Sequence, residues 1–358
     1  MNAGGAARGR LLAMPLLFEP FTTRSVTIRN RIVVAPMCQY SAGTDGLATD
    51  WHLVHLGSRA VGGAGLVIVE ATAVEARGRL SQADLGLWDD AQIGPLTRVA
   101  RFLEDHGAVA GIQLAHGGRK GFSDTKAHGP EAVVGPSAIA FDEGWRTPDA
   151  IDARGLDGVV EAFRAAARRA LLAGFRVVEI HAAHGYLLHE FLSPLSNRRE
   201  DDHGGSLENR ARLLHRVVGA VREVWPAELP LWVRLSCTDW APGGLVVEEC
   251  AAALAGLAGA IDVVHCSSGG NVATATIPVA PGYQVPFAAH LKRATGLPTC
   301  AVGLLNEAAQ CEAVLESGDA DLVALGREEL RDPYFPLHAA RSLGVDLPYW
   351  PRQYLRAR

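Results

Sequence analysis

The strongest constraint on the fold is a series of eight short apolar runs that alternate with longer amphipathic stretches. The runs occupy residues 31–36, 65–70, 108–114, 175–181, 231–235, 261–265, 298–303 and 321–326. Continuous apolar runs of this length are typical of parallel strands that are covered on both faces. Eight strand–helix units in 358 residues predict an α/β protein built as a single (β/α)8 TIM barrel.

A doubly wound open sheet is the competing architecture. No G-x-G-x-x-G motif follows the first strand and no change in composition marks a second domain, so the barrel is favoured. We expect residues 16–358 to form this barrel, with the C-terminal tail included. Residues 1–15 are expected to be a frayed extension and not a targeting segment, because their apolar stretch is short and broken by proline.

Three long segments between strands and helices are expected to be extended βα loops. They cover residues 39–50, 116–157 and 182–205. Such loops carry the active sites of barrel enzymes. The apolar pattern also predicts a helix over 157–173, a helix capped by Ser206, and a helix that is capped by Asn306 and runs to Leu315.

Composition excludes several classes of protein. The net charge is −5 and the basic residues form no block, which argues against a nucleic-acid partner. No run of 18 apolar residues is present, which argues against a membrane span. None of the six cysteines forms a C-x-x-C pair, and several lie in apolar runs, which favours a reducing, cytoplasmic location.

Polar residues gather where the predicted strands end, and His181 and His184 stand out among them. They could bind a metal, pack against the backbone, or donate two hydrogen bonds to one carbonyl or anionic oxygen. The metal reading needs further ligands, and Glu179, two residues before His181, is expected to face the other side of its strand. We therefore favour the pair of donors and predict no metal.

Three further residues at the predicted mouth have a functional and a structural interpretation. Tyr186 could donate a proton to a developing carbanion or could simply pack. Arg234 could stabilise a delocalised anion or pair with a carboxylate of the barrel. Gln113 could offer both a donor and an acceptor to a flat heterocycle.

Glycines at the ends of the last two strands indicate a phosphate site. Gly303 and the Gly326–Arg327 pair would let backbone N–H groups approach a phosphate, as barrels often do at these strands. None of the three lysines ends a strand, which argues against Schiff-base chemistry, and neither a P-loop nor a G-x-S-x-G motif is present. A phosphate-bearing cofactor with a flat ring, FMN, is the economical explanation.

The sequence resembles the old yellow enzyme family of flavin-dependent ene-reductases, and within it the thermophilic-like subgroup that includes xenobiotic reductases. The resemblance extends over nearly the whole chain and is carried by residues 30–40, 111–119, 179–188, 193–199 and 326–328. It implies a barrel with non-covalent FMN and with NADPH as the reductant. The positions that match flavin contacts are Ala35, Pro36, Met37, Cys38, Ala71, Gln113, Arg234, Gly303, Gly326 and Arg327.

The resemblance also implies roles at the substrate. His181 and His184 match the pair that binds the substrate carbonyl, Tyr186 matches the proton donor, and Tyr40 matches a second phenol. Cys38 matches the cysteine with which the subgroup tunes its flavin.

The C-terminal tail resembles a segment that reaches a neighbouring subunit's site in relatives. Arg356 fits the arginine of that segment, although Arg352 and Arg358 compete with it and a mobile terminus is the alternative. We therefore expect a homodimer or homotetramer. The extension before residue 16 and the loop 123–146 depart from a minimal family pattern.

The resemblance implies an NADPH-dependent ene-reductase that acts on small molecules. Its expected substrates are α,β-unsaturated carbonyl compounds, including enones, enals and maleimides, and also nitro compounds. Hydride would pass from flavin N5 to the β-carbon, and Tyr186 would protonate the α-carbon. The alternatives are a metal-dependent barrel hydrolase using His181 and His184, and a ligand-binding barrel without turnover.

Overall fold

A closed barrel of eight parallel strands forms the centre of the computed structural model, which describes residues 14–358. Residues 1–13, most of the predicted extension, lie outside the described residues. The strands, in their order around the barrel, are β3 (Ile32–Val34), β4 (Leu66–Ala73), β5 (Val109–Ala115), β8 (Val177–Ala182), β9 (Leu231–Ser236), β10 (Val263–Ser267), β11 (Thr299–Val302) and β12 (Leu322–Leu325). Each of the eight overlaps one of the predicted runs, and the predicted barrel is confirmed; β4 and β10 extend two or three residues beyond their runs.

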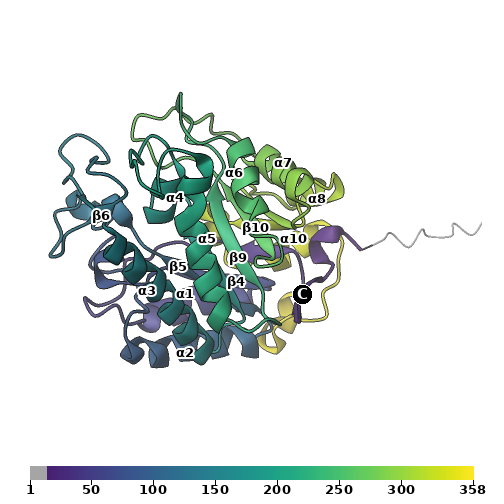
Figure 1. The fold of residues 1–358 in the computed structure, drawn as a ribbon. Coiled ribbons are helices and arrows are strands. Elements are labelled where there is room, and N and C mark those ends of the chain that lie inside the picture. Colours follow the sequence, from purple (N-terminus) through teal and green to yellow (C-terminus); the bar gives the residue numbers. More distant parts are fainter. Residues whose placement is uncertain (1–13) are drawn as a thin grey trace, which may run out of the picture.

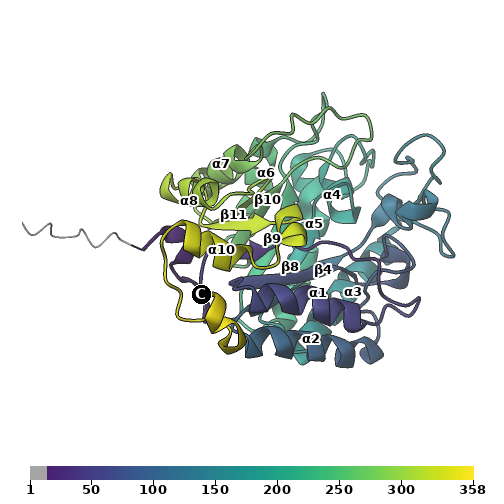
Figure 2. The same cartoon turned by 180° about the vertical axis from the view of Figure 1, so that it is seen from behind.

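Amphipathic helices cover the outside of the barrel, as Figures 1 and 2 show from opposite sides. Those that follow the strands in chain order are α1 (Asp50–Val61), α2 (Ile93–Asp105), α3 (Ala153–Leu172), α5 (Leu207–Val224), α6 (Val247–Ala255), α7 (Val285–Thr295) and α8 (Ala308–Glu316). The last strand leads to α9 (Arg327–Arg331) and α10 (Phe335–Ser342), and a short helix, α4 (Leu187–Leu192), lies in the loop after β8. The apolar faces of these helices and both faces of the strands join in one core.

The helix starts test three of the sequence predictions. Ser206 caps α5 as predicted, because its hydroxyl accepts from the Asn209 N–H. The helix predicted over 157–173 begins earlier, at Ala153, because the Asp152 carboxylate accepts from the Gly155 N–H and caps that turn. The predicted cap at Asn306 is wrong, since α8 begins after Glu307 and the Asn306 side chain accepts from Arg331 instead.

A hairpin at the start of the chain covers the end of the barrel where the strands begin. Its strands are β1 (Phe21–Thr23) and β2 (Val26–Ile28). Gly65 directly precedes β4, and a Cβ added to it would lie 2.7 Å from the Ile28 side chain. The opposite end of the barrel is therefore left to the long βα loops.

The longest of these loops follows β5 and contains a short parallel pair, β6 (Val134–Gly135) and β7 (Asp149–Ala150). Figure 1 shows this segment projecting from one edge of the molecule. Among residues 14–358, no helix has both the length and the apolar character needed to cross a membrane.

Candidate active site

Three aromatic side chains that the sequence singled out converge at the mouth of the barrel. The ring centroids of His181 and His184 lie 5.0 Å apart, and that of Tyr186 lies 4.9 Å from His181 and 6.3 Å from His184. All three pairs meet edge to face, with interplanar angles between 83° and 88°. His181 is the last residue but one of β8, and the other two lie in the segment that follows this strand.

Both imidazoles are neutral at physiological pH. Burial, and next the positive charge of Arg234, lower the pKa of His181 and of His184 well below the ordinary value. Each ring therefore carries one proton, and its hydrogen-bond partners decide which nitrogen holds it.

The partners of the two rings assign a directed chain of hydrogen bonds. His181 Nδ1 accepts from the Ala183 N–H at 3.2 Å, so the His181 proton is on Nε2, 3.3 Å from His184 Nδ1. The His184 proton is then on Nε2, 2.7 Å from the Ser267 hydroxyl oxygen. A substrate oxygen that takes a hydrogen bond from His184 Nδ1 needs the other tautomer. Ser267 permits both tautomers, because a hydroxyl can accept or donate.

The turn after β8 has a backbone conformation that few side chains tolerate. His184 has φ 59°, and its N–H donates to the Ser236 hydroxyl at 2.8 Å. Gly185 has φ 72°, and a Cβ at this position would lie 2.3 Å from the Gly270 carbonyl oxygen. Glycine is required here both by conformation and by space.

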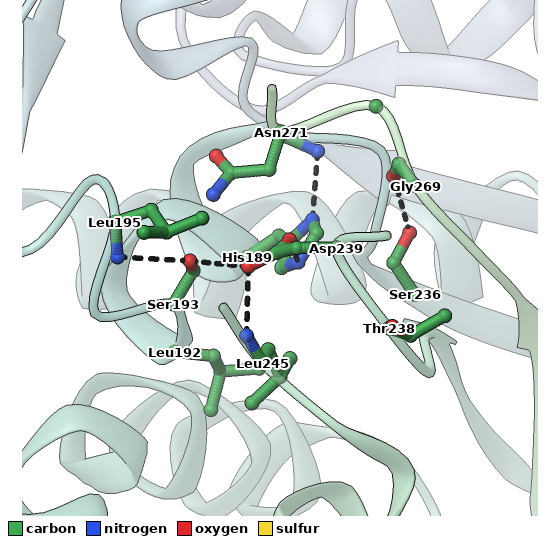
Figure 3. Close-up of polar contacts among 12 residues, drawn as sticks. His189, Leu192, Ser193, Leu195, Ser236, Thr238, Asp239, Leu245, Gly269 and Asn271 are labelled. Atoms are coloured by element: carbon green, nitrogen blue, oxygen red, sulfur yellow. Dashed lines mark hydrogen bonds and ion pairs between the residues drawn. The ribbon is translucent and has the colours of Figure 1, made fainter. Parts of the chain in front are cut away.

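A buried network fixes the same turn from the other side (Figure 3). His189 Nδ1 accepts from the Gly185 N–H at 2.8 Å, and its Nε2 lies 3.0 Å from an Asp239 carboxylate oxygen. The other oxygen of Asp239 accepts from the Ser193 hydroxyl at 2.5 Å and from the Leu245 N–H at 2.8 Å. Burial opposes the ionisation of Asp239, but its bonds with His189 and Ser193 outweigh it and lower the pKa.

Arg234 lies buried inside the barrel, on β9, and is the register partner of His181. Its Nε atom is buried without a hydrogen-bond partner, and among residues 14–358 no carboxylate lies within 4.0 Å of its guanidinium nitrogens. The ion pair considered for Arg234 is therefore not formed. Although burial lowers the pKa of Arg234, a guanidinium remains charged at neutral pH, so the charge is available to a bound group.

Glu179 corrects one prediction. It was expected to face away from His181, but residues two apart on a strand share a face, and Glu179 points into the barrel. Its carboxylate accepts from Gln113 at 2.7 Å and contacts His265 Nδ1 at 2.8 Å. Burial opposes its ionisation, but His265, Arg234 and Gln113 outweigh it and lower the pKa. Glu179 thus holds Gln113 in place and balances the charge of Arg234.

The loop after β3 brings Cys38 to the mouth and is held by a buried carboxylate. The Gln39 N–H donates to one Glu70 oxygen at 2.6 Å, and His52 Nε2 lies 3.2 Å from the other. Cys38 and Tyr186 both pack against a small cluster that includes Ala71. Burial, and next the charges of nearby acids, raise the pKa of Cys38, so it is a neutral thiol.

A cavity of about 580 Å³ lies beyond Tyr186 and contains residues that the sequence analysis missed. Lys120, Phe141 and Trp145 line it together with the predicted Tyr40, which is 60% exposed. The Lys120 ammonium donates to the carbonyls of His184 and Gly270, both at 2.9 Å. The sequence analysis gave Lys120 no role because it does not end a strand. Its position in the long loop after β5 could have indicated it, since such loops carry the active sites of barrel enzymes.

The remaining positions predicted to contact flavin lie around the same end of the barrel. Ala35 follows β3 and its N–H donates to the Leu325 carbonyl, while Ala71 is the register partner of Gln113. A Cβ added to Gly326 would lie 3.7 Å from the Met37 sulfur, and Gly303 has φ 137°. Pro36 is buried between Ala35 and Met37, and Arg327 begins α9. A flat anionic ring would find a floor of small residues and the unpaired Arg234 charge, so these residues fit FMN.

Arg356 lies in an exposed 3₁₀ turn, Arg352–Ala357, at the end of the chain. The neighbouring Tyr354 hydroxyl lies 3.4 Å from that of Tyr334, and Arg358 pairs with Asp346. The tail is thus placed against its own chain, at Tyr334 and Asp346.

Comparisons with known proteins agree with this geometry. The model of the NADH:flavin oxidoreductase / NADH oxidase family matches residues 16–345. An NADPH dehydrogenase of Geobacillus thermodenitrificans (strain NG80-2) is 50% identical over 343 residues, which cover 95% of this chain and 98% of the relative. An NADPH dehydrogenase of Listeria monocytogenes serotype 4b (strain CLIP80459) is 48% identical over 96% of this chain and 99% of its own.

Two solved structures share the fold. Morphinone reductase has a TM-score of 0.80 and 29% identity, with 93% of this chain and 91% of the other covered. The old yellow enzyme homologue from Zymomonas mobilis has a TM-score of 0.78 and 27% identity, with 96% and 98% covered. These matches confirm the resemblance drawn from the sequence, and the chain therefore belongs to the NADH:flavin oxidoreductase / NADH oxidase family of flavin-dependent oxidoreductases.

Proposed function

We propose that the protein is an FMN-dependent NADPH dehydrogenase that reduces the activated C=C bond of α,β-unsaturated carbonyl compounds. The observation that carries the proposal is the convergence of two neutral imidazoles and a largely buried phenol beside an arginine that has no carboxylate partner. When bound, FMN supplies the flat ring that accepts hydride from NADPH and delivers it to the β-carbon of the alkene. Arg234, Gln113, Gly303, Gly326 and Arg327 are the residues that would hold it.

His181 and His184 bind the substrate oxygen. Their N–H groups are neutral donors, and each bond strengthens as negative charge grows on the oxygen during hydride transfer. The pair therefore stabilises the transition state more than the ground state. Removing one such donor typically costs about 10²-fold in rate.

Tyr186 supplies the proton. Burial raises the pKa of its phenol far above the ordinary value, so the hydroxyl is protonated across the physiological range. As the β-carbon gains hydride, the α-carbon gains the π electrons and takes this proton, which leaves a saturated product. The phenolate formed lies near the positive charges of Arg234 and Lys120.

Half-reactions measured separately test these roles. We expect Tyr186→Phe to slow flavin reoxidation by 2-cyclohexen-1-one while flavin reduction by NADPH stays near normal. We expect His184→Ala to retain flavin but to lose about 10²-fold in enone turnover. His106→Ala, at an exposed helix end, is the matched control for a lost imidazole. Unchanged enone turnover in His184→Ala, or a slowed NADPH step in Tyr186→Phe, would refute the assignment.

We further propose a homo-oligomer in the cytoplasm, in which Arg356 reaches a neighbouring subunit's site. The exposed, unburied tail and the six free cysteines support this proposal. Sedimentation of the native enzyme, together with the Michaelis constant of Arg356→Ala, tests it. A monomer, or a variant with unchanged substrate affinity, would contradict it.

A further inference from the structure

The cavity beyond Tyr186 is larger than the reacting groups require. Its volume is about 580 Å³, yet of the three converging rings only Tyr186 lines it. Pockets of roughly 300–1,000 Å³ enclose drug-sized ligands. A small cyclic enone bound at His181 and His184 would leave most of this space unfilled.

Phe141 and Trp145 form an aromatic shelf on the outer wall of the cavity. Their ring centroids lie 4.9 Å apart at an interplanar angle of 73°. Tyr40 lines the cavity from the loop after β3, and Tyr186 closes its inner end. Aromatic walls of this kind bind flat apolar groups through dispersion and edge-to-face contacts.

Hydrogen bonds and packing hold the shelf in place. The backbone N–H of Trp145 donates to the Asp142 carbonyl at 3.1 Å, and the backbone N–H of Arg146 donates to the Lys126 carbonyl at 3.0 Å. The Trp145 ring packs on a buried cluster of Phe122, Ala127 and Val133. A preformed wall loses little conformational entropy when a ligand binds.

The charges around the cavity do not favour an ionic ligand. The Lys120 ammonium lies 4.5 Å from the Phe141 ring centroid and 5.0 Å from that of Tyr186, and its hydrogen bonds go to two backbone carbonyls. The Asp124 carboxylate lines the same cavity, and its negative charge would repel an anionic ligand. The hydroxyls of Ser81 and Ser123 also line the cavity, but they donate to protein oxygens. The apolar lining left for recognition consists of the aromatic rings, Leu80 and Ala83.

From these features we propose that the shelf of Phe141 and Trp145 is a distal substrate subsite for an aromatic or polycyclic apolar group. The preferred substrates are neutral activated alkenes that carry such a group on the side away from the reacting bond. This substrate class rests on the proposed ene-reductase function, whereas the shelf as a binding site does not.

Binding of two inert phenols tests the subsite without turnover. Phenol places its oxygen at the histidine pair, and 4-phenylphenol adds one ring that can reach the shelf. We expect the oxidised flavin enzyme to bind 4-phenylphenol about tenfold more tightly than phenol, measured by flavin absorbance. Trp145→Ala should remove this difference and leave phenol affinity unchanged, while Trp145→Phe should retain most of it.

Controls keep the result interpretable. Leu172→Ala, an exposed apolar position on α3, should behave as the wild type, and Phe141→Leu gives a second variant if Trp145→Ala folds poorly. Equal affinities for the two phenols in the wild type, binding of neither, or equal weakening of both in the shelf variants would overturn the subsite.

Turnover separates the two proposals. We expect 5-phenyl-2-cyclohexen-1-one to exceed 2-cyclohexen-1-one in kcat/KM by about tenfold, and this ratio should fall to near one in Trp145→Ala. Selective phenol binding without turnover of either enone would refute the proposed function and support the shelf. Turnover of both enones with no phenyl preference would refute the shelf alone.

Discussion

His189 makes one hydrogen bond and one close contact with a carboxylate, and two replacements can separate them. Its Nδ1 accepts from Gly185, between His184 and Tyr186, and its Nε2 faces Asp239 (Figure 3). The amide oxygen of His189→Asn can take the place of Nδ1, but the side chain is too short to reach Asp239. The amide nitrogen of His189→Gln can take the place of Nε2, but nothing then accepts from Gly185.

Each variant therefore loses one of these two buried polar contacts, and only His189→Gln frees the turn that carries His184 and Tyr186. A buried polar group left without a partner costs about 1–3 kcal/mol, so both variants should be less stable by that amount. His189→Asn can lose somewhat more stability, because the partner it loses is the charged Asp239 carboxylate. A misplacement of about 1 Å at reacting groups can cost about 10²-fold in rate. We expect a loss of about 10- to 100-fold for His189→Gln and less than about threefold for His189→Asn.

Urea unfolding and anaerobic stopped-flow reoxidation by 2-cyclohexen-1-one measure the two effects on the same samples. If His189 only braces the fold, activity will follow stability, and the less stable variant will be the slower one. Equal rates in the two variants, or a slower His189→Asn, would show that the Gly185 bond does not position the turn.

Three shorter predictions concern the same region. Ser267→Ala removes the partner of His184 Nε2 and should lower kcat/KM for enones by about tenfold, with Ser267→Thr near wild type in the same steady-state assay. Burial raises the pKa of Glu190 to about 8, so its contribution to stability is complete below about pH 4.5 and is lost as the pH rises towards 8, by roughly 1.4 kcal/mol per pH unit. Urea unfolding of Glu190→Gln should show a flatter pH dependence, and an unchanged slope would contradict the assignment. Gly185→Ala should lower the melting temperature and abolish enone turnover, because its Cβ would meet the Gly270 carbonyl at 2.3 Å.

Sequence patterns predicted the barrel because each strand is a continuous apolar run, which depends only on local composition. They also placed His181, His184 and Tyr186 together, since all three lie within six residues at one strand end. Helix starts were less predictable: Asp152 and Ser206 both cap helices, but Asn306 has the same chemistry and caps none. Whether a polar side chain caps depends on the backbone around it.

Contacts between distant segments were beyond local patterns. Ser267 meets His184 across 83 positions, and Trp145 reaches the cavity from a loop with no regular apolar period. The wrong prediction for Glu179 was avoidable from the sequence alone. Side chains two residues apart on a strand share a face, so Glu179 and His181 both point into the barrel. Applied correctly, that rule predicts a carboxylate beneath Arg234.

The polar interior of the barrel separates two electrostatic tasks that would conflict on one side chain. Arg234 carries a permanent positive charge below the mouth, and this charge helps to keep His181 and His184 neutral. Because they carry no charge, the two imidazoles can donate hydrogen bonds to a substrate oxygen without forming ion pairs with the reductant or the product. The negative charge of Glu179 partly offsets the positive charge of Arg234. The Glu179 carboxylate is held in place by Gln113 Nε2 at 2.7 Å and by His265 Nδ1 at 2.8 Å. A change at Arg234 would therefore alter both its own charge and the pKa of the two histidines. Ser267 and His189 contact His184 and Gly185 directly, so the geometry of the two donors can be altered alone at these positions.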